Sequence, residues 1–367
     1  MSGPIRVGVV GGGLVSQVVH LPVLTRLHRH YTLRALAEPS PALRAGLGRR
    51  FGIDALHEDW REMIHSGQLD AVVVAAPNAL HAPIVLAALS AGLHCFVEKP
   101  LCIDPADAVR IAAAADRADR VVQVGYMKRF DRVAESAVAA LRDAAASPLV
   151  VDVMTYDPGL SRFFGPDELR PAPGDVPAGA RDELREAEQA QCHAAVGAAA
   201  DRDADRRMLV DVFLGALVHD VNLLAWIADA RGLGPLRGTD ARILPDARGA
   251  QVSGLMGDAP WTASWVSTPA IDDFAETVRV LTPDAAHELC FQAPYGAVKR
   301  RGTRHTVRAG GRSTTTEERD DSFDRELAAF AAAITGHGAR RNVVEEAARD
   351  VTLLCELFAT AGGRSAS

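Results

Sequence analysis

Residues 7–16 read VGVVGGGLVS, a run of β-branched residues that leads into three glycines and then into a helical stretch. Gly11 permits a tight turn after the strand, and Gly13 lets the backbone approach a pyrophosphate. The following helix offers free N–H groups and the positive end of its dipole to the phosphates. Ser16 replaces the third glycine of the usual fingerprint and is still small enough for close packing of helix on strand. The pattern predicts a dinucleotide-binding turn formed by Gly11, Gly13, Leu14 and Val15.

Strands and helices alternate through the first 125 residues. This spacing predicts a parallel sheet with helices on both faces. Runs such as AVVVAA are apolar on both sides, as expected of strands that are covered twice. The expected strands are Ile5–Val10, Tyr31–Glu38, Ala71–Ala76, His94–Glu98 and Val121–Val124.

The pattern changes after Asp131. Gly159–Ala180 is rich in Pro and Gly and predicts a long loop or mobile lid, ahead of a charged helix at Arg181–Gln191 and an apolar helix at Met208–Ala230. Residues 235–312 hold alternating runs separated by turn residues, which favours a mostly antiparallel sheet. The fold class is therefore α/β. We expect a dinucleotide-binding domain at 1–126, a substrate-binding and oligomerisation domain at 127–340, and a C-terminal helix at 341–367 that packs back near the first domain.

The bulk composition excludes several classes of protein. A chain of 367 residues with 48% hydrophobic residues and a net charge of −7 is typical of a globular protein and argues against a nucleic-acid binder. The five cysteines form no CxxC pair, which suits a reducing cytosol and predicts no disulfide and no metal site. Residues 1–10 lack the features of a signal peptide, and the apolar run 209–228 contains charged residues. We expect a cytoplasmic protein without a membrane or nucleic-acid partner.

Glu38 closes the second expected strand. A carboxylate there can accept hydrogen bonds from the adenosine ribose hydroxyls, and its charge would repel a 2′-phosphate. The residue therefore favours NAD over NADP. The alternative is an ordinary exposed charge before a proline turn.

Three further motifs follow strands: AAPNALH at 75–81, FVEKP at 96–100 and GYMKRFD at 125–131. Loops at the carboxyl ends of strands line the crevice where doubly wound folds bind ligands. A lysine before proline is held in extended geometry, so Lys99 can reach into that crevice. Asn78 and His81 could instead be turn and cap residues, and Lys99 a solvated charge.

A fifth motif is the helical segment GALVHDVNLLAW at 215–226. On an α-helix, Gly215 and His219 share a face, and Asp211 lies one turn earlier on it. His219 is a candidate catalytic residue, although a lone helical histidine is more often structural.

In this order, the five motifs resemble those of the Gfo/Idh/MocA oxidoreductases over nearly the whole chain, together with the terminal helices FDRELAAFAAAI and DVTLLCELFATA. The resemblance implies a Rossmann domain followed by an α/β domain with a large, mostly antiparallel sheet. One face of that sheet often forms a subunit interface, so we expect a homodimer or homotetramer.

The resemblance also assigns roles. Lys99 matches the lysine that binds the reacting oxygen and relays its proton, Glu98 matches a glutamate near the nicotinamide ribose, and the bond before Pro100 is commonly cis. His219 matches a histidine that contacts the substrate. The family's aspartate four residues before it is Gly215 here, which puts the complete acid–base set in doubt. The implied cofactor-binding residues are Gly11, Gly13, Leu14, Val15, Glu38, Pro77, Asn78, His81, Glu98, Lys99 and Arg129. The implied substrate-binding residues are Lys99, Tyr126, Tyr156, Asp211 and His219.

The expected activity is NAD(H)-dependent interconversion of a secondary hydroxyl and a carbonyl on a small polar substrate: a sugar, aminosugar or cyclitol. Two alternatives remain open. One is reduction of an imine or ketone intermediate in specialised metabolism, which the missing aspartate favours. The other is an NAD-bound sensor without catalysis, against which the retained Lys99 and His219 argue.

Overall fold

The computed structural model describes residues 3–159, 174–293, 302–319 and 321–362. The chain forms two compact units. The first comprises residues 1–126, 166–195 and 323–351, and the second comprises residues 127–165, 196–322 and 352–367. The sequence-based division placed 166–195 and 323–340 in the second domain and 341–367 in a separate C-terminal helix. In the structure the first unit is assembled from three stretches of chain.

The first unit is built on a parallel sheet of strand order β3-β2-β1-β4-β5-β6. This is the strand order of a Rossmann fold, which confirms the expected architecture. Val7, Val9, Val72 and Val73 are fully buried, as the apolar runs of the sequence require. The strands are β1 (Ile5–Val10), β2 (Tyr31–Ala37), β3 (Ala55–His57), β4 (Ala71–Val74), β5 (His94–Glu98) and β6 (Val122–Gly125).

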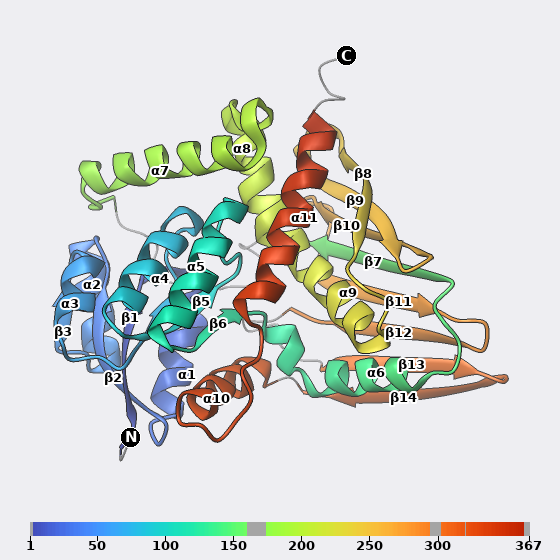
Figure 1. Cartoon of the computed structure of the whole chain (residues 1–367), viewed down its shortest axis with the longest axis horizontal. Coiled ribbons are helices and arrows are strands. Elements are labelled where there is room, and N and C mark those ends of the chain that lie inside the picture. Colours follow the sequence, from blue (N-terminus) through green and yellow to red (C-terminus); the bar gives the residue numbers. More distant parts are fainter. Residues whose placement is uncertain (1–2, 160–173, 294–301, 320, 363–367) are drawn as a thin grey trace. The chain divides into compact units, whose positions relative to one another are not determined.

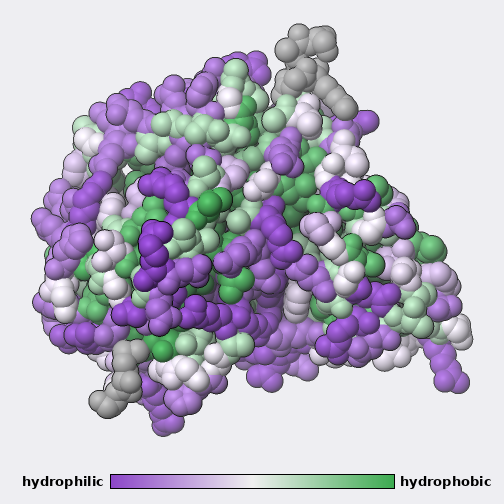
Figure 2. Space-filling model, viewed as in Figure 1, coloured by the Kyte–Doolittle hydropathy of each residue, from purple (hydrophilic) through white to green (hydrophobic). Residues whose placement is uncertain are grey.

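Helices cover both faces of this sheet (Figure 1). Side-chain caps fix the starts of α2, α3 and α5, because Ser40, Asp59 and Asp104 each accept a hydrogen bond from the backbone N–H two or three residues later. On the face shown in Figure 2, hydrophilic residues are interspersed with hydrophobic ones over this unit. The described helices are η1 (Ser16–His20), α1 (Leu21–Arg26), α2 (Pro41–Phe51), α3 (Trp60–His65), η2 (Asn78–Leu80), α4 (His81–Ser90), α5 (Pro105–Ala118), α7 (Ala178–Val196) and α10 (Ser322–Ile334).

Residues far along the chain complete the core of the first unit. The Tyr31 hydroxyl donates to the Leu327 carbonyl at 2.6 Å, and the Gln123 amide donates to the Glu326 carbonyl at 3.0 Å. The Asn342 amide donates to the carbonyls of Val124 and Tyr126. These buried bonds explain why residues 323–351 group with the N-terminal strands.

The second unit contains a sheet of strand order β14-β13-β12-β11-β7-β10-β9-β8. Only the pairing of β7 with β10 is parallel, so the expected large, mostly antiparallel sheet is confirmed for the described residues. The strands are β7 (Val150–Asp157), β8 (Arg237–Ile243), β9 (Gly249–Met256), β10 (Ala259–Ser267), β11 (Ala275–Leu281), β12 (Ala285–Phe291), β13 (Thr303–Ala309) and β14 (Arg312–Glu318).

The helices of the second unit include the apolar stretch that the sequence singled out. Asp203–Arg231 is long and apolar enough to cross a membrane, but 72% of its most apolar window is buried inside the fold. It is a core helix with an interruption: Met208–Leu217 is π-helical. The described helices are η3 (Met127–Phe130), α6 (Arg132–Asp143), η5 (Gly197–Ala200), α8 (Asp203–Arg207), η6 (Met208–Leu217), α9 (Val218–Arg231), η7 (Pro245–Ala247) and the end of α11 (Val344–Gly362).

Candidate functional site

The glycine turn after β1 has the geometry that its sequence predicts. Gly11 has a φ of 95°, and a Cβ there would lie 2.3 Å from the Ala75 carbonyl oxygen. Gly13 faces open space, so a ligand can approach its backbone. The Ser16 hydroxyl donates to the Gly11 carbonyl at 2.6 Å and ties the start of the helix to the turn. Only glycine fits at position 11, and the turn is open at position 13.

Glu38 follows β2 and lies against this turn. Its carboxylate accepts hydrogen bonds from the Gly12 N–H at 2.8 Å and from the Ser40 N–H at 2.9 Å. A Cβ at Gly12 would come within 3.1 Å of the Glu38 carboxylate and 2.8 Å of Leu47. The sequence pattern gave no role to Gly12, yet the absence of its side chain lets the carboxylate reach the turn. Glu38 is 7% exposed and is not a surface charge.

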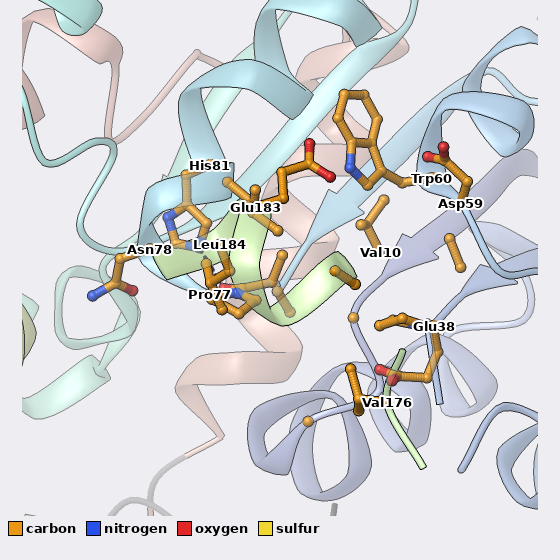
Figure 3. A pocket seen from close by; sticks show the side chains of 18 of the residues that line it. Val10, Glu38, Asp59, Trp60, Pro77, Asn78, His81, Val176, Glu183 and Leu184 are labelled. Atoms are coloured by element: carbon orange, nitrogen blue, oxygen red, sulfur yellow. Dashed lines mark hydrogen bonds between the residues drawn. The ribbon is translucent and has the colours of Figure 1, made fainter. Parts of the chain in front are cut away.

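A cavity of about 810 Å³ opens beside the turn (Figure 3). Every residue that lines it belongs to the first unit. The cavity brings together all the expected cofactor-binding residues except Arg129. These are Gly11, Gly13, Leu14, Val15, Glu38, Pro77, Asn78, His81, Glu98 and Lys99.

His81 connects two of the loops that line this cavity. Its ring nitrogens lie 2.7 Å from the Pro100 carbonyl oxygen and 2.9 Å from the Ala76 carbonyl oxygen. Burial lowers the pKa of the imidazole, which favours its neutral form. His81 therefore lies between the AAPNALH and EKP loops, and its neutral ring can donate a hydrogen bond to one of the two carbonyls at a time.

Glu98 is held by a residue that the sequence motifs did not reveal. Its carboxylate lies 2.8 Å from the His20 ring nitrogen Nε2, and His20 is fully buried. Burial opposes ionisation of Glu98, but the hydrogen bond from His20 and the charges of His20 and Lys99 outweigh it and lower its pKa. His20 lies within the GGGLVSQVVHLP motif, but a single histidine on a helix gives no signal of its partner.

Lys99 lines the cavity beside this ionised carboxylate. The Lys99–Pro100 peptide bond is cis, as the resemblance implied. The arrangement places an amine and a carboxylate at the carboxyl end of β5 and an imidazole at the start of α4, and all three line the cavity. Such a set can bind a polar group and exchange a proton with it.

The remaining expected residues occupy other places. Tyr126 is buried, and Tyr156 is 45% exposed near the end of β7. Arg129 is buried in the second unit, where its guanidinium donates to the Asn222 side chain at 2.8 Å and lies over the Trp226 ring. Arg129 does not line the cavity.

His219 and Gly215 lie on the interrupted helix of the second unit. His219 is partly exposed at the start of α9, whereas Asp211 and Gly215 lie in the π-helical segment. Because π-helical hydrogen bonds span five residues, the expected α-helical face does not apply to Asp211. A Cβ at Gly215 would lie 2.9 Å from the Val210 carbonyl oxygen, which is closer than real Cβ atoms come. In this helix geometry, any side chain at position 215, including the family's aspartate, would crowd the Val210 carbonyl.

The long loop expected at Gly159–Ala180 is only partly within the described residues, since 160–173 fall outside them. Its last three residues, Ala178–Ala180, are helical and begin α7, contrary to expectation. Val176, Pro177 and Ala180 line the cavity, together with Arg181, Glu183 and Leu184. Among the described residues, no group of three or more His, Cys, Asp or Glu side chains could hold a metal ion.

Comparison with known proteins gives one family match. Residues 5–126 match the family described as "Oxidoreductase family, NAD-binding Rossmann fold", which is Gfo/Idh/MocA. An inositol 2-dehydrogenase of Saccharopolyspora erythraea is 37% identical over 131 residues, which are 35% of this chain and 38% of the relative. One of Rubrobacter xylanophilus is 35% identical over 192 residues, which are 45% and 53% of the two chains. The matches therefore span about half the length of these relatives or less.

Solved structures resemble the whole chain. A 3-ketoreductase from Actinomadura kijaniata, in complex with NADP and TDP-benzene, has a TM-score of 0.71, 19% identity and 98% coverage of both chains. UDP-N-acetylglucosamine 3-dehydrogenase from Acidithiobacillus ferrooxidans has a TM-score of 0.69 with 16% identity and the same coverage. At these identities the likeness shows a shared fold across both units.

Proposed function

We propose that this chain, whose residues 5–126 match the Gfo/Idh/MocA oxidoreductase family, is an NAD(H)-dependent oxidoreductase. It interconverts a secondary hydroxyl and a carbonyl on a sugar, aminosugar or cyclitol. One observation carries the proposal: Lys99 and Glu98 line the same cavity as the glycine turn and Glu38. The inositol dehydrogenases and nucleotide-sugar enzymes among the similar proteins support the substrate class.

The residues present fit a dinucleotide. Gly11 makes the turn, Gly13 leaves open space for a pyrophosphate, and the following helix supplies N–H groups. Glu38 presents a carboxylate for the adenosine ribose, because one of its oxygens can accept a further hydrogen bond while both keep their backbone donors. The negative charge of Glu38 favours NAD over NADP.

When bound, NAD(H) supplies the hydride chemistry, and the protein must align the carbon and manage one proton. Lys99 holds the reacting oxygen and exchanges its proton. The ionised Glu98, bonded to His20, gives the ammonium group of Lys99 a fixed negative neighbour. His81 holds the loop of Lys99 through the Pro100 carbonyl. His219 is the expected substrate contact of the second unit.

The test uses the purified full-length chain. Titration with NADH should enhance and shift the nicotinamide fluorescence. Adding oxidised sugars or inosose should then quench it in step with NAD formation. A panel that also holds imines and simple ketones separates the substrate classes. Binding of NADH without turnover of any carbonyl or imine would support the sensor alternative and overturn the proposed activity.

The proposal includes a cytoplasmic homodimer or homotetramer. Its support is the resemblance to a family in which the large sheet often forms a subunit interface. Light scattering of the full chain measures the assembly directly, and a monomer at micromolar concentration would contradict it.

A further inference from the structure

The segment 174–195 forms one wall of the cavity in the first unit. Its residues Val176, Pro177, Ala180, Arg181, Glu183 and Leu184 line the cavity, and Figure 3 shows several of them among the Rossmann residues. It comes from a stretch of chain far beyond the Rossmann strands in sequence. The wall therefore brings to the cavity side chains that the Rossmann motifs do not contain.

Three side chains of this wall make four polar contacts with the rest of the first unit. The Asp175 carboxylate accepts hydrogen bonds from the Ser40 hydroxyl at 2.7 Å and from the Ala42 N–H at 3.0 Å. Glu183 pairs with Arg61 at 2.6 Å, and the Gln191 amide donates to the Ala79 carbonyl at 2.8 Å. The contacts lie beside β2, at α3 and before α4, so the segment follows the cavity along its length.

Asp175 and Glu38 meet at one residue. The Glu38 carboxylate accepts from the Ser40 N–H, while the Asp175 carboxylate accepts from the Ser40 hydroxyl. Asp175 also takes the Ala42 N–H, one of the free donors in the first turn of α2. Two carboxylates therefore surround the place where β2 ends and α2 begins.

We infer that Asp175 is a second determinant of cofactor choice, which excludes the 2′-phosphate of NADP from the end of β2. The inference rests on the proposed function, in which Glu38 binds the adenosine ribose. A 2′-phosphate carries a charge of about −1.5 to −2 and needs several hydrogen-bond donors. Here it meets two carboxylates, and Asp175 already occupies the Ser40 hydroxyl and the Ala42 N–H.

The neighbouring groups strengthen this exclusion. Hydrogen bonds from Ser40 and Ala42, with the charge of Arg44, lower the pKa of Asp175, so its charge is present at neutral pH. An arginine near this place accommodates the 2′-phosphate in NADP enzymes. Arg44 instead donates to the backbone carbonyls of Glu38 and Pro39 and pairs with Glu58 at 3.7 Å.

The test measures dissociation constants of NADH and NADPH by fluorescence titration of the full-length chain. Asp175→Asn removes the charge at nearly constant shape, and Asp175→Ser also frees the donors. Each should reduce the preference for NADH by about tenfold, as expected for one exposed like-charge interaction, with NADH affinity changed less than about threefold. The difference between wild type and Asp175→Asn should shrink at about 1 M salt, because salt screens it.

Asp182→Asn is the matched control. Asp182 is an exposed aspartate of α7 that pairs with Arg185, whereas Asp175 contacts Ser40 and Ala42 at the end of β2. Substitution of Asp182 changes the net charge equally and should leave the preference unchanged. If both Asp175 variants prefer NADH over NADPH as strongly as wild type does, the inference about Asp175 is wrong, but the proposed function still stands. A wild-type chain that binds neither dinucleotide, or binds NADPH as tightly as NADH, overturns the proposed cofactor as well.

Discussion

The glycine turn of the first unit and the π-helical segment of the second unit both hold residues that the sequence resemblance singled out, but the two regions agree with that expectation to different degrees. At the turn, Gly11, Glu38 and Lys99 line one cavity as expected. On the helix, Gly215 replaces an aspartate and Asp211 lies in a π-helical stretch. The turn is fixed by sheet topology, which brings the carboxyl ends of parallel strands to one edge. On the helix, by contrast, which side chains share a face depends on the helical pitch, and the π-helical segment Met208–Leu217 changes that pitch.

The largest expected effect is on catalysis, at the cavity beside the glycine turn, which Lys99 lines. Lys99→Met should lower turnover about 10²-fold or more, the usual value of a positioned proton donor, with NADH affinity within a few-fold of wild type. Steady-state kinetics and fluorescence titration measure the two quantities. His219→Ala should cost less, about tenfold, and partly in KM. Full activity in Lys99→Met would remove the proposed mechanism.

The glycine turn allows a paired test of fold against binding. Gly11→Ala places a methyl group against the Ala75 carbonyl at a positive φ, so it should destabilise the chain by about 2 kcal/mol or more. Gly13→Ala meets no protein atom within 4 Å and should leave the unfolding free energy unchanged while weakening NADH binding. Urea unfolding and NADH titration of both variants separate the effects. Equal losses of unfolding free energy in Gly11→Ala and Gly13→Ala would contradict the separate roles of the two glycines.

Substitutions at Gly215 test the π-helical segment of the second unit. Gly215→Ala and Gly215→Asp both add a Cβ that crowds the Val210 carbonyl, so both should lower the unfolding free energy by about 1–3 kcal/mol. Gly215→Asp should therefore not raise activity toward sugar alcohols. If Gly215→Asp were as stable as wild type and more active, the helix geometry would not be the reason for the missing aspartate.

The smallest expected effect is pH dependence, in both units. Burial, with a smaller effect of nearby charges, lowers the pKa of His94 in the first unit and of His305 in the second to about 4. Because unfolded histidines titrate near a pH of about 6.5, stability from both is complete above that pH and is lost as pH falls toward 4. Thermal unfolding at pH values of about 7.5, 6 and 5 should show a falling Tm.

Substitution of His94 tests whether this residue causes the fall in Tm at low pH. His94 Nδ1 accepts a hydrogen bond from the Val121 N–H at 2.9 Å, which a protonated ring cannot do. His94→Gln should reduce the loss of Tm between about pH 6 and pH 5, whereas substitution of the exposed His28 should not. An unchanged slope in His94→Gln would assign the acid sensitivity elsewhere.

Much of the first unit could be predicted from the sequence. The expected β1, β2, β4, β5 and β6 lie where the β-branched runs do, because strands apolar on both faces have a strong signal. The three residues of β3 were missed, since so short a strand has no periodicity. The cavity residues followed from strand ends, but His20 and Gly12 did not, because their roles depend on partners far away in sequence.

Helices and their docking were less predictable. The charged helix at Arg181–Gln191 was expected and is part of α7, but nothing local indicates that it lines the cavity beside the glycine turn. Two of its contacts are polar bonds to Arg61 and Ala79, which leave no local pattern in the sequence. The π-helical segment was also missed, because apolar periodicity was interpreted at the α-helical pitch.

The Tyr31–Leu327 bond has a consequence for modularity. The family match ends at residue 126, but the folded unit does not, since it also takes in residues 323–351 and the wall at 174–195. A graft of residues 1–126 onto another protein would leave the Tyr31 hydroxyl without its buried carbonyl and the cavity without one side. For recombination, the transferable cofactor module is three separate stretches of chain, and a single crossover after residue 126 should yield poorly folded chimaeras.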